Sequence, residues 1–388
     1  MFIPTYNRFP VIMVKGSGCR LQDGDGREYL DFLAGIAVCS LGHCHPAVTE
    51  AICAQARKLV HVSNLFHTGP QTELAELLIE HSFADRVFMA NSGAEANEAA
   101  IKLARKYSGT DRFEIISLEG SFHGRTLATV TATGQPKFHE GFEPLPAGFR
   151  YAPFGDIAAL EQAITPQTCA ILCEPIQGES GVRPLEQEYL HGISKICRKH
   201  DLLLIFDEVQ TGMGRTGTLF AYEQCGVTPD IMTLAKALGN GMPIGAMLTT
   251  EKIGAAFTPG THASTFGGNP VAAAAGVTTV RTMLADGFLA EVRAKGVYFT
   301  GKLNELASRH QHLAIKARGA GLLQGLVLTE AGIEHGPAIV ETLFERGILI
   351  NFAGNAVLRF IPPLVVSREE IDTVIDALDD VLAGLPST

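Results

Sequence analysis

The chain has 388 residues, of which 46% are hydrophobic and 19% are charged, and its formal net charge is −10. This length and composition indicate a soluble globular protein of two domains rather than one. No apolar run approaches about 20 residues, so we expect no membrane span, and the acidic balance argues against a surface that binds nucleic acid.

The N-terminus and the cysteines predict a cytoplasmic protein. The first six residues lack a basic segment followed by an apolar stretch, so we expect no signal peptide. The eight cysteines form no C-x-x-C pair, which favours reduced thiols over a disulfide framework. We also expect no bound metal. The three adjacent residues His43, Cys44 and His45 rarely converge on one ion, and Pro46 is typical of a helix start.

The first 90 residues predict short strands followed by two helices. Residues 12–33 contain the sequence Asp23-Gly24-Asp25-Gly26, which is typical of a hairpin turn. We expect helices over about 46–59 and 71–81, and a first buried strand over 86–90.

The segment 91–98 follows that strand and opens a helix. A strand, a small polar turn and a helix N-terminus direct free backbone N–H groups at an anion. Ser92 could equally be an N-cap alone, with Glu95 completing a capping box, and the two roles are compatible.

Two further predicted strands, 113–118 and 169–173, lead into polar loops. Phe122 could stack on a flat heterocycle, and Arg125 could bind a carboxylate with two hydrogen bonds. Taken singly, such residues are more often a packed aromatic ring and a solvated cation. The second loop, residues 174–181, carries Glu174 and Glu179.

The apolar run 202–206 predicts a strand buried on both faces, and Asp207 follows it. Lys236 follows the apolar run 231–234. Burial lowers the pKa of a lysine, as a Schiff-base lysine requires, and a ligand beyond the strand ends could supply the cation that Asp207 needs. Singly, Asp207 could be a helix cap or a solvated turn residue, and Lys236 could be a surface residue. Together they match pyridoxal phosphate (PLP), whose aldehyde a lysine binds and whose pyridine nitrogen an aspartate keeps protonated.

The sequence 212–217 fits the dinucleotide fingerprint G-x-G-x-x-G, which would favour a nicotinamide cofactor instead. That fingerprint must turn directly from a strand into a helix, whereas Asp207 to Thr211 intervene here and no good helix follows. We therefore reject the nicotinamide interpretation.

The remainder of the chain predicts a strand over 244–248, a loop over 262–268 and a helix that begins at Asn269-Pro270. From about residue 287 the pattern changes to a helix followed by short strands, and a capping box at Ser367 starts a last amphipathic helix. Arg359 lies within an apolar strand and needs an anionic partner. We predict an N-terminal segment (1–59) that contributes to a small domain, a large α/β domain (60–280) with a mostly parallel sheet, and a C-terminal α+β small domain (281–388).

These motifs, in this order, closely resemble the class III PLP-dependent aminotransferases. The resemblance covers residues 91–98, 122–126, 174–179, 207–210, 236 and 265–270. It implies the fold type I architecture, a homodimer with sites at its interface, and a reaction between a small-molecule amino donor and 2-oxoglutarate. Other activities of the family share the same motifs, and a non-catalytic PLP-binding regulator would need an added DNA-binding segment that this chain lacks.

The resemblance also implies a role for each site residue. Lys236 binds the aldehyde and Asp207 pairs with the pyridine nitrogen. Ser92, Gly93 and Ala94 hold the phosphate, and Thr265 of the partner subunit contributes to the same site. Phe122 stacks on the ring, and Gln210 contacts the ring hydroxyl. Arg125 and Ser264 recognise the donor. Arg359 binds the α-carboxylate of the second substrate, and Glu179 pairs with Arg359 when ω-amino donors bind.

Overall fold

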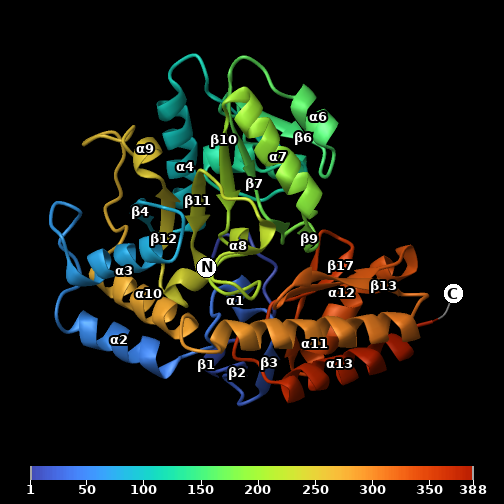
Figure 1. The fold of residues 1–388 in the computed structure, drawn as a ribbon. Coiled ribbons are helices and arrows are strands. Elements are labelled where there is room, and N and C mark those ends of the chain that lie inside the picture. The colour runs from blue at the N-terminus through green and yellow to red at the C-terminus, as the bar shows by residue number, and fades with distance from the viewer. Residues whose placement is uncertain (1, 387–388) are drawn as a thin grey trace.

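The computed structural model describes residues 2–386, and its largest sheet has seven strands (Figure 1). From β11 to β6 neighbouring strands pair in parallel, whereas β12 runs antiparallel to both β11 and β4. The expected mostly parallel sheet is therefore confirmed, with one reversed strand. Its spatial order is β4 (Arg86–Ala90), β12 (Gly245–Thr249), β11 (Ile231–Leu234), β10 (Leu203–Asp207), β7 (Thr168–Cys173), β5 (Glu114–Leu118) and β6 (Phe149–Ala152).

Strand β10 is buried on both faces because its apolar residues alternate between two helices. Leu204 and Phe206 pack in the cluster that contains α7 (Gln187–His200), and Leu203 and Ile205 pack in the cluster that contains α4 (Gly93–Ser108). Figure 1 shows α4 and α7 flanking the sheet. This double burial explains the continuous apolar run in the sequence, and it leaves only the strand ends for polar chemistry.

Helix α10 (Pro270–Met283) packs against α2 (Pro46–Ala56) and α3 (Gly69–Glu80). It begins as expected, since the Asn269 side chain accepts a hydrogen bond from Ala272 N and Pro270 is its first residue. Helix α2 ends at Ala56, three residues before the expected end. The remaining short elements here are α1 (Ala34–Ala37), α5 (Leu127–Ala132), α6 (Ile157–Gln162), α8 (Tyr222–Cys225), α9 (Glu251–Gly254), the 3₁₀ helices η1 (Pro136–Phe138) and η2 (Lys236–Gly239), and the hairpin of β8 (Ile176–Gln177) and β9 (Arg183–Pro184).

The C-terminal part of the chain forms an antiparallel sheet with helices against it (Figure 1). The strands of this sheet have the order β13 (Ala314–Ala320), β14 (Leu323–Leu328), β17 (Val357–Phe360) and β16 (Asn351–Ala353). Three helices pack on the sheet or on one another, namely α11 (Phe288–Arg309), α12 (Glu330–Glu345) and α13 (Arg368–Ala383). The predicted capping box is present at the start of α13, where Ser367 and Glu370 bond reciprocally. Strand β13 and helix α12 were not predicted.

The two ends of the chain share a third sheet. Strands β1 (Met13–Ser17), β2 (Arg20–Asp23) and β3 (Glu28–Asp31) form an antiparallel meander, and β3 pairs in parallel with β15 (Ile348–Leu349). The hairpin turn lies at the predicted place, because the Asp23 carboxylate accepts hydrogen bonds from Asp25 N and Arg27 N. The domain boundaries stay a prediction.

Within residues 2–386, no helix is long and apolar enough to span a membrane. The same residues contain no group of three His, Cys, Asp or Glu side chains arranged to hold a metal ion. His43 instead bonds through Nε2 to Asp31 Oδ2 at 2.6 Å. All eight cysteines are unpaired thiols.

Candidate active site

A cavity of about 400 Å³ opens where the parallel strands end. Its walls come from the segments that follow five strands of the large sheet, beginning with Asn91 after β4, Phe122 after β5, Glu174 after β7, Asp207 at the end of β10 and Ala235 after β11. Because the carboxyl ends of these strands lie at one edge, residues more than 140 positions apart in the sequence border one space.

Lys236 lines this cavity and is held in an unusual backbone conformation. It lies at the first position of η2 with φ of +45°, a left-handed value that is uncommon outside glycine. Strain of this kind persists where the surrounding structure requires it, and it is concentrated at functional sites. Burial lowers the pKa of the Lys236 ammonium, which favours a neutral amine that can act as a nucleophile.

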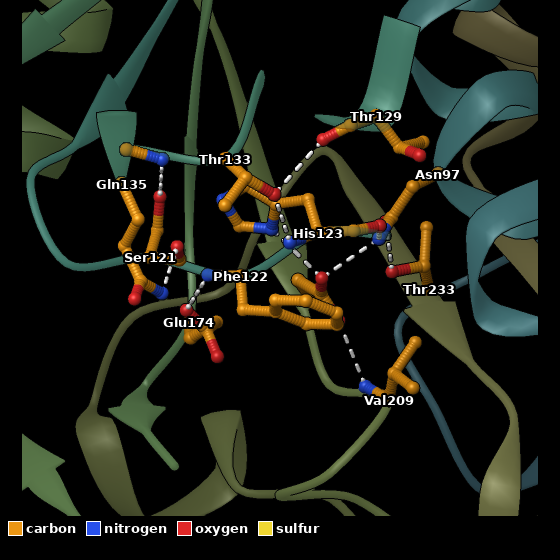
Figure 2. Close-up of polar contacts among 12 residues, drawn as sticks. Asn97, Ser121, Phe122, His123, Thr129, Thr133, Gln135, Glu174, Val209 and Thr233 are labelled. Atoms are coloured by element: carbon orange, nitrogen blue, oxygen red, sulfur yellow. Dashed lines mark hydrogen bonds and ion pairs between the residues drawn. The ribbon is translucent and has the colours of Figure 1, made fainter. Parts of the chain in front are cut away.

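Asp207 is buried and receives three hydrogen bonds from the protein. Asn97 Nδ2 and His123 Nδ1 donate to Oδ2 at 2.7 and 2.8 Å, and Val209 N donates to Oδ1 at 3.0 Å. Thr233 in turn donates to Asn97 Oδ1, and Figure 2 shows how Asn97, His123 and Thr233 converge. His123 Nε2 is buried without a partner among residues 2–386. Asp207 is therefore a fixed carboxylate, and the alternative of a solvated turn residue is wrong.

The N-terminus of α4 borders the same cavity through Ser92, Gly93 and Ala94. Backbone N–H groups in the first turn of a helix have no intrahelical acceptor, so this end can bind an anion. The Ser92 side chain accepts from Glu95 N at 3.2 Å, as expected for an N-cap. The predicted capping box is wrong in one detail, because the Glu95 carboxylate accepts from Asn91 N and Asn91 Nδ2 instead of from Ser92 N.

Phe122 and Glu174 form a neighbouring wall of the cavity. Phe122 N donates to Glu174 Oε2 at 3.0 Å (Figure 2). Burial, reinforced by the negative charge of Asp207, raises the pKa of Glu174 well above its ordinary value. This shift favours the neutral form of the carboxyl group, which would add no second negative charge beside Asp207.

Arg359 finds its anionic partner in Glu179. Arg359 is buried, and its Nη1 lies 2.7 Å from Glu179 Oε1. Burial by itself raises the pKa of Glu179, but the positive charges of Arg359 and Lys236 outweigh this effect and lower the pKa to about 2. Gln210 Nε2 also donates to Glu179 at 3.1 Å, and Asn351 Oδ1 accepts from Arg359 Nε at 3.0 Å. The pair is thus ionised and fixed, and its Glu179 side chain lines the cavity.

Arg125 lines the cavity from the other loop and has a different environment. Its side chain is exposed and makes no hydrogen bond or ion pair with residues 2–386. One arginine of the site is therefore neutralised by a protein carboxylate, and the other is available to an anionic ligand.

Ser264 and Thr265 do not border the cavity within one chain. Ser264 Oγ accepts from Asn91 Nδ2 at 3.1 Å and from Gly267 N at 3.0 Å, which holds the loop near the cavity. Thr265 is exposed. Their roles toward the donor and toward the phosphate of the partner subunit stay predictions.

Comparison with known proteins agrees with this geometry. Residues 2–382 match the family described as Aminotransferase class-III. The chain belongs to the class III aminotransferases, and it is a PLP-dependent transaminase of fold type I.

Among curated relatives and solved structures, the chain is similar to acetylornithine and ornithine aminotransferases. The acetylornithine aminotransferase of Caldanaerobacter subterraneus subsp. tengcongensis is 54% identical over 98% of this chain and 97% of its own length. The acetylornithine aminotransferase of Neisseria meningitidis serogroup B is 50% identical over 99% of this chain and 98% of its own length. Among structures, the ornithine aminotransferase from Toxoplasma gondii ME49 matches with a TM-score of 0.94 at 34% identity, covering 98% of this chain and 92% of its own. N-acetylornithine aminotransferase from Stenotrophomonas maltophilia K279a matches with a TM-score of 0.85 at 39% identity, covering 97% and 96%.

The structure adds residues whose roles were not predicted. Asn97 and Thr233 hold Asp207, and Asn351 holds Arg359. A signal existed for Asn97, which lies four residues after Gly93 and therefore on the same face of α4. Asn351 had no such signal, because only strand pairing places it opposite Arg359.

Proposed function

We propose that this protein transfers the terminal amino group of N-acetylornithine to 2-oxoglutarate, giving N-acetylglutamate semialdehyde and glutamate in arginine biosynthesis. The names of relatives that are 48–54% identical over nearly the whole chain support this substrate. One observation of the site carries the proposal, namely that Arg125 is unpaired while Arg359 is paired with Glu179. A donor with a single carboxylate then needs only Arg125, whereas an α-amino dicarboxylate such as glutamate must displace Glu179.

The residues present fit pyridoxal phosphate. Bound in the cavity, it would withdraw electrons from the carbon that carries the transferred amine. The α4 N-terminus would hold the phosphate through Ser92, Gly93 and Ala94, with Thr265 added by the partner subunit. Gly93 has no room for a side chain, since a Cβ there would lie 2.7 Å from Val209, so the helix end is shaped by close packing.

The other site residues would orient and charge the ring. Asp207, fixed by three donors, would keep a proton on the pyridine nitrogen, and Phe122 would stack on the ring face. Gln210 would contact the ring hydroxyl, although its amide now bonds to Glu179.

Lys236 is the group that would move the proton at the reacting carbon. Because burial lowers its pKa, its amine accepts a proton from the substrate carbon on one side of the transfer and returns it on the other. Water must be excluded from this step, and Val38, Met242 and Ile244 contribute apolar side chains to the cavity wall. The expected kinetics are ping-pong, since each half-reaction uses the same cavity.

We also propose a cytoplasmic homodimer. Large apolar side chains are exposed beside the loop that carries Thr265, namely Leu65, Phe66 and Phe266. Asn64 Nδ2 donates to Ser264 O at 2.9 Å, so these side chains and the loop form one surface. A second copy of the chain that covers this surface would bury it and bring Thr265 to the partner's site. The unpaired thiols suit a reducing compartment.

A donor panel with 2-oxoglutarate as acceptor tests the substrate. We expect kcat/KM for N-acetylornithine to exceed the values for N-succinylornithine, ornithine and 4-aminobutyrate. Ornithine is the second candidate, because the ornithine aminotransferase structure from Toxoplasma gondii superimposes with a TM-score of 0.94. A higher kcat/KM for ornithine would overturn the proposal.

A further inference from the structure

Phe138, at the end of η1, does not line the cavity but contacts a residue that does. The Arg125 guanidinium carbon lies 4.0 Å from the centroid of the Phe138 ring and 5.6 Å from that of Phe122. The two rings meet edge to face, with centroids 5.8 Å apart and an interplanar angle of 82°. Arg125 therefore rests against an aromatic corner built from two separate segments of the chain.

This corner is the main restraint that the structure shows on Arg125. The Arg125 side chain is exposed and has no hydrogen bond or ion pair with residues 2–386, so its contacts with the two aromatic rings are the side-chain interactions that restrain it. A cation over an aromatic ring is attracted by the ring quadrupole. Such a contact uses the face of the guanidinium and leaves the N–H groups on its edge free to bind a carboxylate with two bonds.

Phe138 is itself fixed to the loop that carries Phe122. Phe138 N donates to Gln135 O at 3.0 Å. Gln135 Nε2 donates to Ser121 O at 3.0 Å and to Gly120 O at 3.3 Å, and Figure 2 shows Gln135 beside Ser121. These hydrogen bonds join the two segments, so contacts within the protein hold the two rings at their spacing.

We propose that Phe138 is a positioning residue for Arg125 and that it determines selectivity for donors with a carboxylate remote from the reacting amine. This inference rests on the proposed function, in which Arg125 binds that carboxylate. The ring holds the guanidinium at the cavity wall before the donor arrives, so less conformational freedom is lost on binding.

The test compares Phe138→Leu with wild type in the full-length holoenzyme. Leucine keeps an apolar side chain but removes the ring. Donors are N-acetylornithine and n-pentylamine, which has a five-carbon chain and no carboxylate, and each is followed in single-turnover half-reactions. We expect kcat/KM for N-acetylornithine to fall roughly twofold to thirtyfold, through KM, with n-pentylamine unchanged. Phe138→Tyr should restore the wild-type ratio.

Phe142→Leu is the matched control, because Phe142 is an exposed phenylalanine of the same segment with no aromatic contact to Arg125. A calorimetric Kd for pentanoate supplies a readout without turnover, and it should rise in Phe138→Leu by the same factor as KM. Equal losses for both donors, or an unchanged donor ratio, would overturn the inference.

Arg125→Gln separates the proposed role of Arg125 in donor binding from the positioning role of Phe138. If Arg125→Gln leaves the donor ratio unchanged, the proposed role of Arg125 fails and the inference fails with it. If Arg125→Gln lowers the ratio while Phe138→Leu does not, the proposed function stands and only the positioning role of Phe138 is wrong.

Discussion

Replacing Glu179 with alanine removes the carboxylate that occupies Arg359. The structure places Glu179 Oε1 2.7 Å from Arg359 Nη1, and Arg359 is buried. A hydrogen bond between charged groups is worth about 1.5–3 kcal/mol. Glutamate must break this bond to place its α-carboxylate on Arg359, whereas an ω-amino donor leaves it intact. Glu179→Ala should therefore raise the ratio of kcat/KM for glutamate to kcat/KM for N-acetylornithine by about 10- to 150-fold.

The assay follows each half-reaction separately by the change in cofactor absorbance, with glutamate or N-acetylornithine as the only amino donor. Glu179→Gln is the control, because it keeps a hydrogen-bond acceptor without the charge and should give a smaller change in the ratio. Arg359 retains Asn351 Oδ1 and Gly178 O as neutral acceptors, so the alanine variant should fold with a stability loss of about 3 kcal/mol, the lower end of the range for a broken buried ion pair. A folded Glu179→Ala protein with the wild-type ratio would refute the reasoning.

The same pair predicts a pH dependence of stability. The pKa of Glu179 is about 2 in the folded protein, below its ordinary value of 4.5. A lowered folded-state pKa means that the stabilisation is complete above pH 4.5 and is lost as the pH falls toward 2. The difference in Tm between wild type and Glu179→Ala should therefore shrink over that interval and stay constant at neutral pH. A difference that is independent of pH throughout would contradict the assignment of this pKa.

Further substitutions test the other parts of the site. Lys236→Ala should abolish both turnover and the imine absorbance, and a variant that keeps either would refute its role. Asp207→Asn should lower kcat by at least about a hundredfold, since an amide cannot hold the ring proton, and an unchanged kcat would exclude this role. Gly93→Ala should raise the Kd for pyridoxal phosphate by about tenfold or more, because the new methyl group would press against Val209. Ser367→Ala should cost about 1 kcal/mol in denaturant unfolding without changing kcat, through loss of a helix cap remote from the cavity.

Several elements of the fold could be predicted because local pattern and burial agree. The strands that became β5, β7, β10 and β11 are short apolar runs with no competing helical period. Helix α12 could not be predicted, since Gly332, Gly336 and Pro337 all disfavour a helix. Tertiary packing overrides this preference. A Cβ on Gly336 would lie 2.6 Å from the Phe352 ring, so glycine is needed there for the helix to approach β16.

The direction of β12 was not predicted. An apolar run such as Gly245 to Thr249 has the same composition whether its neighbours run parallel or antiparallel to it. Only the short connection through η2 after β11 decides that the chain turns back.

The sequence by itself determined which chemical groups the site contains. A lysine and an aspartate that each follow a buried strand, a small polar turn before a helix and an arginine in an apolar strand are local facts with local causes in desolvation and backbone geometry. Tertiary structure decided which of these groups meet. Glu179 reaches Arg359 across 180 positions of the chain, and His123 and Asn97 reach Asp207, because sheet order and strand register set those distances. Electrostatic interactions depend on separation in space, and separation along a chain does not determine it.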